Sequence, residues 1–406
     1  MGRRPTGFSA SPKVQGTLGY SAWQCRVGCQ EADGRITGCT GLGTVPGRER
    51  QPGWPSILSI LLILSDFCAK SIGGWDSMVE PLRVGVIGVG VMGERHARAL
   101  AELPQTTLVA VVDANPETAA RVGAAHGVAA YHDYRDLLAR EKLDAVVVAT
   151  ADQYHRDPTV DALRQGLAVF LEKPVASTWA DAQAIWNAAQ ETGGKVMVGH
   201  TLRYDTRYAA TAQAAREGKL GDIIHIYARR NATTWSGRRL GGRATPAVFQ
   251  GVHDYDVIRW VTGAEVTRVY AASVSKALTD LKVPDATVAT LHLSNGAVAI
   301  VEESWAVPYG VPSLLDARLE VIGTQGAAYV DMTPQGLSLY VDGKFTQPDT
   351  IYTAPGLHIL KDMYHRFIAY IAGQAEAVAT LQDGMAALKV ALAVDESARL
   401  GRPVDL

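Results

Sequence analysis

The chain has 406 residues, of which 47% are hydrophobic and 20% charged, and its formal net charge is −2. This length exceeds one ordinary domain and this composition allows sizeable cores, so two domains are expected. The charge balance lacks the basic excess of nucleic-acid-binding proteins, which leaves small polar molecules as the expected partners.

The first eighty residues are rich in Gly, Arg, Pro and Ser and show no sustained helical or strand period. Residues 1–80 are therefore expected to form a poorly structured extension. Their apolar run, 57–64, is shorter than the roughly 20 residues that span a bilayer. Three interpretations stay open: translation begins at Met78, the extension is real but disordered, or the run is the core of an export signal. We favour the first, and expect a cytoplasmic protein without membrane contact.

All the cysteines fall within this extension. A disulfide framework is therefore not expected to hold the main fold. A zinc site built on them would lack a nearby histidine, and no other metal-binding pattern stands out, so no metal is predicted. The cysteines are Cys25, Cys29, Cys39 and Cys68.

Residues 81–200 alternate between short apolar runs and segments with helical spacing. Continuously apolar strands joined by helices are typical of a parallel sheet covered on both faces. Right-handed crossovers then give a doubly wound α/β Rossmann domain. The expected strands are 84–88, 108–113, 144–150, 168–172 and 195–199, and the expected helices are 94–103, 116–126, 157–166 and 177–192, the last capped by Ser177.

Residues 201–406 change to strands without long helices between them, which predicts an α+β domain with an open, mainly antiparallel sheet. Turns at Asn295-Gly296 and Asp342-Gly343 indicate hairpins. We expect this domain to bind substrate and, through an exposed sheet face, a second subunit in a homodimer or homotetramer. The expected strands are 223–229, 266–274, 287–293, 298–303, 318–322 and 337–341, and the closing helices, 358–372 and 383–400, can pack back on the first domain.

A glycine loop, Gly88-Val89-Gly90-Val91-Met92-Gly93, follows the first strand and opens the first helix. In this setting the loop predicts a dinucleotide site. Gly88 permits the tight turn, Gly90 lets the backbone approach a pyrophosphate, and Gly93 allows close packing of helix on strand. The helix N-terminus, with Val91 and Met92, offers free N–H groups to the phosphates.

Asp113 ends the second strand, at the position where a carboxylate binds the hydroxyls of the adenosine ribose. A carboxylate there repels a 2′-phosphate, and its neighbours are Ala114 and Asn115 rather than arginine. The expected cofactor is therefore NAD. NADP and FAD are less favoured alternatives.

Two further motifs follow. Glu172-Lys173-Pro174 ends a strand, and His253-Asp254-Tyr255-Asp256 precedes an apolar helix at 257–261. With the glycine loop and the segment 396–404, they resemble the glucose–fructose oxidoreductase / inositol dehydrogenase (Gfo/Idh/MocA) family over residues 82–406. The resemblance implies a two-domain oxidoreductase that transfers hydride between a secondary alcohol of a sugar, cyclitol or related polyol and a nicotinamide cofactor.

The resemblance also implies roles for single residues. It places Lys173 beside substrate and nicotinamide and makes His253 the acid/base. It puts Thr150 and His155 on the nicotinamide side, and Glu172 against cofactor or ribose. The chemistry agrees, since histidine titrates near neutrality and an ammonium stabilises a developing alkoxide.

One position departs from the family pattern. Many members carry an aspartate four residues before the histidine, where it joins the proton relay, whereas this chain has Phe249. Asp254 or Asp256 could substitute; if a helix begins here, Asp256 shares a face with His253 and Asp254 does not. Further candidates to contact substrate are Arg203, Tyr204, Asn231 and Trp305, and the basic stretch 236–243 is either a solvated loop or a lid over an anionic substrate.

Two alternative functions stay open. Some relatives are NAD-dependent glycosidases, which oxidise the substrate transiently with no net redox change. A non-catalytic dinucleotide-sensing regulator would keep the fold and lose the acid/base pair. Retention of Lys173 and His253 argues against the regulator, and Phe249 argues weakly for it.

Overall fold

A computed structural model describes residues 80–307, 315–332 and 357–406, the strands β15 (Gly336–Val341) and β16 (Lys344–Thr346), and the paired short strands β1 (Glu31–Ala32) and β2 (Arg35–Ile36). The chain divides into two units, residues 1–78 and 79–406. The four cysteines, the apolar run 57–64 and the turn at residues 342–343 lie outside the described residues. Among the helices that are described, none is long and apolar enough to cross a membrane.

A parallel sheet of six strands opens the second unit, in the order β5-β4-β3-β6-β7-β8. Its central strands are fully buried because both faces are covered, as their continuous apolar sequence predicts. The doubly wound prediction is confirmed, and only the short β5 was missed, since three half-exposed residues carry no apolar run. The strands are β3 (Leu82–Ile87), β4 (Thr106–Val112), β5 (Ala129–Tyr131), β6 (Ala145–Val148), β7 (Ala168–Leu171) and β8 (Val196–Val198).

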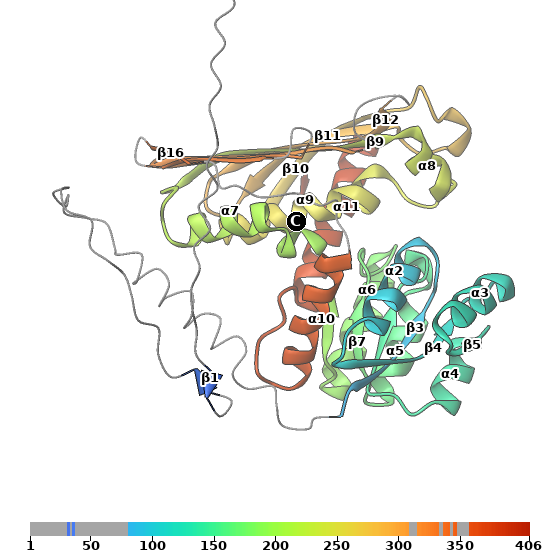
Figure 1. The fold of residues 1–406 in the computed structure, drawn as a ribbon. Helices are drawn as coiled ribbons and strands as arrows, with labels where there is room; N and C mark the ends of the chain where they lie inside the picture. The colour runs from blue at the N-terminus through green and yellow to red at the C-terminus, as the bar shows by residue number, and fades with distance from the viewer. Residues whose placement is uncertain are drawn as a thin grey trace, which may run out of the picture. The chain divides into compact units, whose positions relative to one another are not determined.

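Five helices connect these strands (Figure 1). The four predicted helices are present, whereas α4 was missed. The Ser177 cap was wrong: Thr178 has the extended backbone of a cap, and its hydroxyl accepts a hydrogen bond from the Asp181 N–H. The helices are α2 (Val91–Ala101), α3 (Pro116–His126), α4 (Tyr134–Arg140), α5 (Arg156–Arg164) and α6 (Trp179–Thr192), with single turns η1 (Asp152–Tyr154) and η2 (Thr201–Tyr204).

The second sheet has nine strands in the order β16-β15-β14-β13-β9-β12-β11-β10-β17, antiparallel except for the parallel pair β9 and β12. The open, mainly antiparallel sheet is thus confirmed. Asn295-Gly296 forms the predicted hairpin turn between β11 and β12, with Gly296 at φ 88°. The strands not yet placed are β9 (Ile223–Thr233), β10 (Val266–Val274), β11 (Ala286–Leu293), β12 (Val298–Val307), β13 (Leu315–Gly323), β14 (Gly326–Asp331) and β17 (Val404–Asp405).

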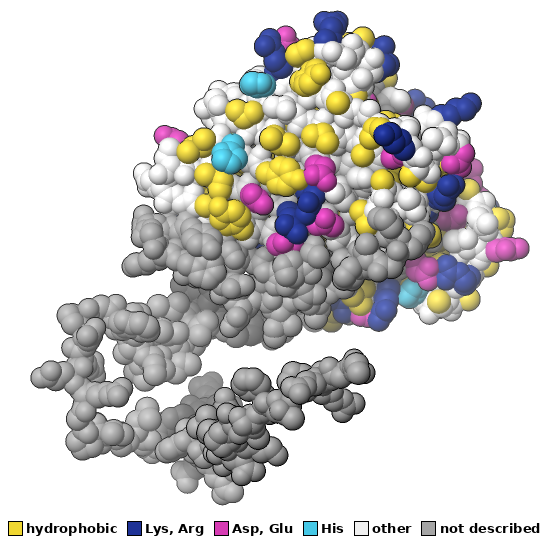
Figure 2. Space-filling model, turned by 90° about the horizontal axis from the view of Figure 1, so that it is seen from above, with side chains coloured by type: hydrophobic (Ala, Val, Ile, Leu, Met, Phe, Trp, Pro, Cys, Tyr) yellow, Lys and Arg dark blue, Asp and Glu magenta, His cyan; other side chains and the backbone are white. Residues whose placement is uncertain are grey.

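Helices α9 and α11 cover one face of this sheet (Figure 1). Its other face is the one seen in Figure 2, where hydrophobic side chains lie among charged ones. Helix α10 packs against α2, on the parallel sheet's side. The helices of this part are α7 (Thr206–Arg216), α8 (Thr234–Leu240), α9 (Val252–Thr262), α10 (Leu357–Ile371) and α11 (Leu381–Leu400), with a π-helical turn η3 (Ala247–Gly251) and a single turn η4 (Thr279–Leu281).

The interpretation of residues 236–243 as a loop was wrong over most of its length. Residues 234–240 form α8, which ends at Gly241 in the left-handed region. A Cβ on Gly237 would lie 2.5 Å from a Leu278 methyl and 2.9 Å from the Trp305 ring, so this glycine serves close packing rather than a flexible turn. Tertiary packing therefore overrides the weak helical propensity of the sequence.

Candidate active site

The glycine loop has the geometry that a dinucleotide needs. Gly88 lies at φ 85°, and a Cβ there would be 2.5 Å from the Thr150 nitrogen. A Cβ on Gly93 would be 1.8 Å from the Gly88 carbonyl oxygen, so only glycine lets α2 start this close to β3. A Cβ on Gly90 would meet nothing within 4 Å. The backbone at the N-terminus of α2 therefore opens onto free space, where N–H groups can meet phosphates.

Asp113, directly after β4, braces this loop. Its carboxylate oxygens accept hydrogen bonds from the Val89 N–H at 3.0 Å and from the Asn115 N–H at 2.9 Å. The side chain remains partly exposed. Since a carboxylate oxygen can accept more than one hydrogen bond, Asp113 keeps the capacity to bind ribose hydroxyls.

Two adjoining cavities follow the carboxyl ends of the parallel strands, as expected for such sheets. They share Gly88, Asp113, Thr150 and Ala151. Thr150 also carries a buried hydroxyl without a hydrogen-bond partner in the described part of the chain. The first cavity, of about 610 Å³, extends past Asp113 to His132, Tyr134 and Tyr154. The second cavity has a volume of about 370 Å³. It is also lined by Gly90, Val91, Met92, Asp152, His155, Glu172, Lys173, Pro174, Arg239, Arg243 and Phe249. The glycine loop, the Asp113 carboxylate and the Thr150 hydroxyl therefore lie where they can bind the phosphates and ribose of a dinucleotide.

Glu172 lines the second cavity, but its carboxylate is already engaged. One oxygen lies 2.9 Å from His96 Nε2, and the other accepts from the Lys173 N–H at 3.1 Å. His96 Nδ1 in turn lies 2.6 Å from the Tyr364 hydroxyl of α10. Burial alone would raise the pKa of Glu172, yet the hydrogen bond with His96 keeps it below the usual value. Glu172 therefore anchors the segment that carries Lys173.

Lys173 points away from that carboxylate, toward the second domain. Its Nζ donates to the Phe249 carbonyl oxygen at 3.1 Å and lies 4.3 Å from the centre of the Phe249 ring. Burial, opposed by the nearby Glu172 carboxylate and helped by Arg230, lowers the pKa of Lys173 to about 8. At neutral pH the side chain is an ammonium that forms no ion pair with any described carboxylate. It can therefore stabilise a negative charge that develops on a nearby atom.

His253 lies in the first turn of α9, four residues after Phe249. The structure thus starts this helix before the histidine rather than at residue 257 as predicted. Burial, together with the cations of Lys173 and Arg230, lowers the pKa of His253 well below its usual range. Its Nδ1 has no hydrogen-bond partner among the described residues. The imidazole is therefore neutral at pH 7 and can accept a proton.

The two carboxylates beside the histidine are occupied by arginines. Asp254 accepts two hydrogen bonds from Arg230, at 2.7 and 2.9 Å. Asp256 accepts two from Arg203, at 2.9 and 2.6 Å. Both aspartates are fully buried. The structure brings them to the histidine's helix, but as partners of arginine.

The substrate candidates do not reach the cavity. Arg203 is committed to Asp256 and Asp383. Asn231 donates to Glu302 at 2.5 Å, and the Tyr204 hydroxyl lies 3.7 Å from the Met197 sulfur. Trp305 is fully buried in a small core with Leu278 and Leu240. None of Arg203, Tyr204, Asn231 and Trp305 is among the residues that line either cavity.

Three further residues were left undecided by the sequence: His200, which could line the substrate site or serve packing, and Arg239 and Arg243, which belong to the stretch 236–243 interpreted as either a solvated loop or a lid over an anionic substrate. His200, after β8, is fully buried, with both ring nitrogens unpartnered within the described chain. Its ring lies edge-on to His253 with centres 6.5 Å apart, and its Nδ1 is 3.7 Å from Asp256. Arg239 and Arg243 line the cavity from α8 and the loop after it. The basic composition of 236–243 marks the two arginines, whereas no local motif marks His200, which packing of distant elements brings to this place.

His155 lines the same cavity and links two segments of it. Its ring nitrogens lie 3.1 Å from the Thr150 carbonyl oxygen and 2.9 Å from that of Pro174. The ring is buried, and this burial lowers the pKa of His155. His155 thus lies beside the proposed cofactor cavity, and its ring nitrogens face backbone carbonyl groups.

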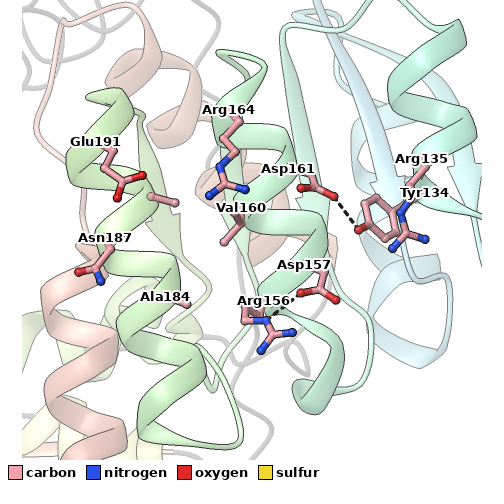
Figure 3. A pocket seen from close by; sticks show the side chains of 11 residues that line it. Tyr134, Arg135, Arg156, Asp157, Val160, Asp161, Arg164, Ala184, Asn187 and Glu191 are labelled. Atoms are coloured by element: carbon pink, nitrogen blue, oxygen red, sulfur yellow. Dashed lines mark hydrogen bonds and ion pairs between the residues drawn. The ribbon is translucent and has the colours of Figure 1, made fainter.

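A further hollow, of about 490 Å³, lies among α4, α5 and α6 (Figure 3). Part of its polar lining is already paired: Tyr134 donates to Asp161 at 2.8 Å, and Arg156 to Asp157 at 2.7 Å. None of the glycine loop, Lys173 and His253 lines it. We assign it no chemistry. Among the described residues, no cluster of side chains suited to hold a metal ion is found.

Comparison with known families gives two matches in succession. Residues 82–200 match the family described as "Oxidoreductase family, NAD-binding Rossmann fold". Residues 208–329 match the GFO/IDH/MocA C-terminal domain. The matches cover the parallel sheet and most of the second sheet.

Individual relatives agree with this assignment. Inositol 2-dehydrogenase of Rhizobium meliloti (strain 1021) is 30% identical over 344 residues, which are 80% of this chain and 99% of that protein. The crystal structure of myo-inositol 2-dehydrogenase from Lactobacillus plantarum matches with a TM-score of 0.70 at 25% identity, over 80% of this chain and 100% of that one. Scyllo-inositol dehydrogenase from Lactobacillus casei, solved with NAD(H) and scyllo-inositol, shares the fold with a TM-score of 0.70 at 23% identity, over 80% and 99% of the two chains.

A buried carboxyl group beneath α9 makes stability depend on pH. Glu303 is 1% exposed, and a Cβ on Gly251 would lie 2.0 Å from its Oε1. Burial raises the pKa of Glu303 to about 8. Because the unfolded chain releases this proton near the ordinary glutamate pKa, unfolding releases a proton at intermediate pH, and stability falls as pH rises toward 8.

We therefore expect the free energy of unfolding of the wild type to fall by roughly 1 kcal/mol relative to that of Glu303→Gln between pH 6.5 and 7.5. The comparison with the variant isolates Glu303, because the buried histidines with lowered pKa values change stability in the opposite direction in both proteins. Denaturant unfolding of the full chain at several pH values measures it. Glu302→Gln, at the adjacent outward-facing position, is the control and should keep the slope. Equal slopes in the wild type and Glu303→Gln would contradict the assignment.

Proposed function

The chain belongs to the Gfo/Idh/MocA oxidoreductase family, and from that premise we propose that it transfers hydride between a secondary alcohol of a sugar, cyclitol or related polyol and NAD. The observation that carries the proposal is the contact between Lys173 Nζ and the Phe249 carbonyl, beside the dinucleotide cavity and four residues before His253. This contact brings a cation and a neutral imidazole, from separate domains, to one place. Relatives named inositol dehydrogenases support the polyol class.

His253 and Lys173 have separate roles in the proposed proton transfer. His253 accepts the proton of the substrate hydroxyl, since its ring is neutral at pH 7. Lys173 stabilises the negative charge that develops on that oxygen. The nicotinamide, when bound, supplies the hydride acceptor. In the reverse direction the same two groups return a proton to the carbonyl oxygen.

Preference for NAD over NADP is part of the proposal. Asp113 is the carboxylate nearest the adenosine side, and it already holds the glycine loop through the Val89 N–H. A 2′-phosphate would meet its negative charge. Binding of both cofactors to the wild type and to Asp113→Ala would measure the preference.

The absence of an aspartate at position 249 changes the route of the proton. Asp254 and Asp256 are held by Arg230 and Arg203, so neither carboxylate is free to take it up. His200 is the polar group that faces His253 on this side. We infer that His200, rather than a carboxylate, adjoins His253 in any relay.

We expect turnover of NAD with one or more members of a polyol panel, reported by absorbance of the reduced cofactor. The panel includes myo-inositol, scyllo-inositol, glucose and their acidic derivatives. Lys173→Met and His253→Asn should each lower kcat/KM by about 100-fold or more, because each removes a group that acts on the proton or the alkoxide. Lys276→Met, at an exposed lysine, should leave the rate unchanged.

Other results would change the assignment. Cleavage of a glycoside without net NADH would indicate transient oxidation and a glycosidase. Tight NAD binding without turnover of any panel member would indicate a regulator. Unchanged rates in both variants would remove Lys173 and His253 from the chemistry.

The pH dependence of alcohol oxidation follows from the same two groups. His253 is neutral well below pH 6.5, so the rate should already be high at pH 7. Lys173 loses its charge above about pH 8, and the rate should fall there. Lys173→Arg, which stays charged, should lose this alkaline limb. An alkaline limb unchanged in that variant would assign it to another group.

We also propose that the outer face of the second sheet binds another copy of the chain. Figure 2 shows hydrophobic side chains among charged ones on this face. The exposed apolar residues of its strands include Tyr270, Val274, Val288 and Ile300, each between 45% and 48% exposed. Neighbouring strands carry them, and exposed apolar groups gathered in this way mark interaction surfaces. The expected assembly is a homodimer or homotetramer.

The double variant Tyr270→Lys and Ile300→Lys should therefore lower the mass of the particle in solution to that of one chain, as light scattering after gel filtration would record. Trp179→Lys, at an exposed aromatic residue on α6, is the control. An assembly that survives the double variant would place the interface elsewhere.

A further inference from the structure

Two arginines extend into the cofactor cavity from the second domain. Arg239 belongs to the last turn of α8, and Arg243 follows it. Both line the cavity that also contains Gly88, Gly90 and Lys173. This cavity therefore has cations on the side that the second domain contributes, in addition to the N–H groups of the glycine loop.

The two arginines differ in how they are paired. Arg243 donates to Asp152 at 3.0 Å, so its charge is balanced. Arg239 is exposed and makes no ion pair with any described residue. Its guanidinium stacks instead on two rings, 5.3 Å from the centre of Trp235 and 5.7 Å from that of Phe249. Stacking of this kind holds the plane of the group without neutralising its charge.

Lys173 is the second unbalanced cation of this cavity. It contacts the same Phe249 ring, at 4.3 Å, and no ion pair of it is found in the described chain. The neutral ring of Phe249 thus contacts both an ammonium and a guanidinium, at a position where a carboxylate would have offset positive charge. Nearby Arg95 adds to the positive surroundings, and burial with Arg243 and Arg95 lowers the pKa of Arg239.

We propose that Arg239 binds an anionic substituent, a carboxylate or a phosphate, of the polyol substrate, while Lys173 faces the hydroxyl that is oxidised. The inference rests on the function proposed above and narrows its substrate class to acidic sugars and cyclitols. A planar guanidinium fits both anions with two parallel hydrogen bonds.

The substrate is a better match than the diphosphate of the cofactor. The loop from Gly88 to Gly93 and the start of α2 already offer N–H groups to phosphates on their own side of the cavity. Arg239 instead shares Phe249 with Lys173, at the reactive end. An anion here would lie beside the group that serves the reacting oxygen.

Titration calorimetry on the full chain, saturated with NADH so that no alcohol can be oxidised, tests the proposal with matched pairs: D-glucuronate and D-glucose, D-galacturonate and D-galactose, and myo-inositol 1-phosphate and myo-inositol. At least one acid should bind tenfold or more tightly than its neutral partner, a typical effect of charged hydrogen bonds. The preference should weaken as salt is raised. In Arg239→Gln the affinities for that acid and its neutral partner should differ by no more than about twofold. Arg239→Lys should keep part of the preference.

Arg238 is the matched control, since it neighbours Arg239 on α8 but pairs with Asp280 on the surface. Arg238→Gln should keep the preference. NAD affinity is measured separately for each variant. If no acid is preferred by the wild type, or if Arg239→Gln weakens NAD binding and leaves the preference intact, the proposal is wrong. Because binding is recorded without turnover, a preference for acids without hydride transfer would overturn the proposed function alone.

Discussion

Two buried ion pairs hold α9, the helix that carries His253. Arg230 donates two hydrogen bonds to Asp254, and Arg203 donates two to Asp256, all in the protein interior. A buried carboxylate without a partner lowers the stability of the folded state, so removing either arginine would destabilise the fold. The arginines come from β9 and from η2, which fixes α9 against both. His253 directly precedes Asp254 on this helix, so these pairs also fix the backbone position of the histidine.

The position of α9 then decides how the two domains meet at the site. Gly88, Asp113, Thr150 and Lys173 each follow a strand of the parallel sheet, which gathers them at one edge. The π-helical turn before α9 brings the Phe249 carbonyl to Lys173 Nζ. The cavity wall is therefore shared: Gly88, Asp113, Thr150 and Lys173 come from the first domain and Arg239, Arg243 and Phe249 from the second, whereas His253 is not among the lining residues.

Much of this arrangement could be predicted from local pattern. Apolar runs marked the strands β3, β4, β6, β7 and β8, and the glycine spacing marked the loop, because both signals lie within a few residues. The partners of Asp254 and Asp256 could not be predicted, since Arg230 and Arg203 lie 24 and 53 residues away in sequence. Gly237 was misleading for the same reason: it packs on Trp305, which is distant in sequence, so a short helix resembled a glycine-containing loop.

Transfer of a deuterium label tests the proposed hydride chemistry most directly. The full chain is incubated with NAD and with polyols that carry deuterium on the carbon of each secondary hydroxyl, and the reduced cofactor is examined by mass spectrometry. A polyol dehydrogenase with Lys173 and His253 at the reacting oxygen predicts one deuterium on the nicotinamide ring. Reduced cofactor without the label, or no reduced cofactor from any neutral or acidic polyol, would contradict it.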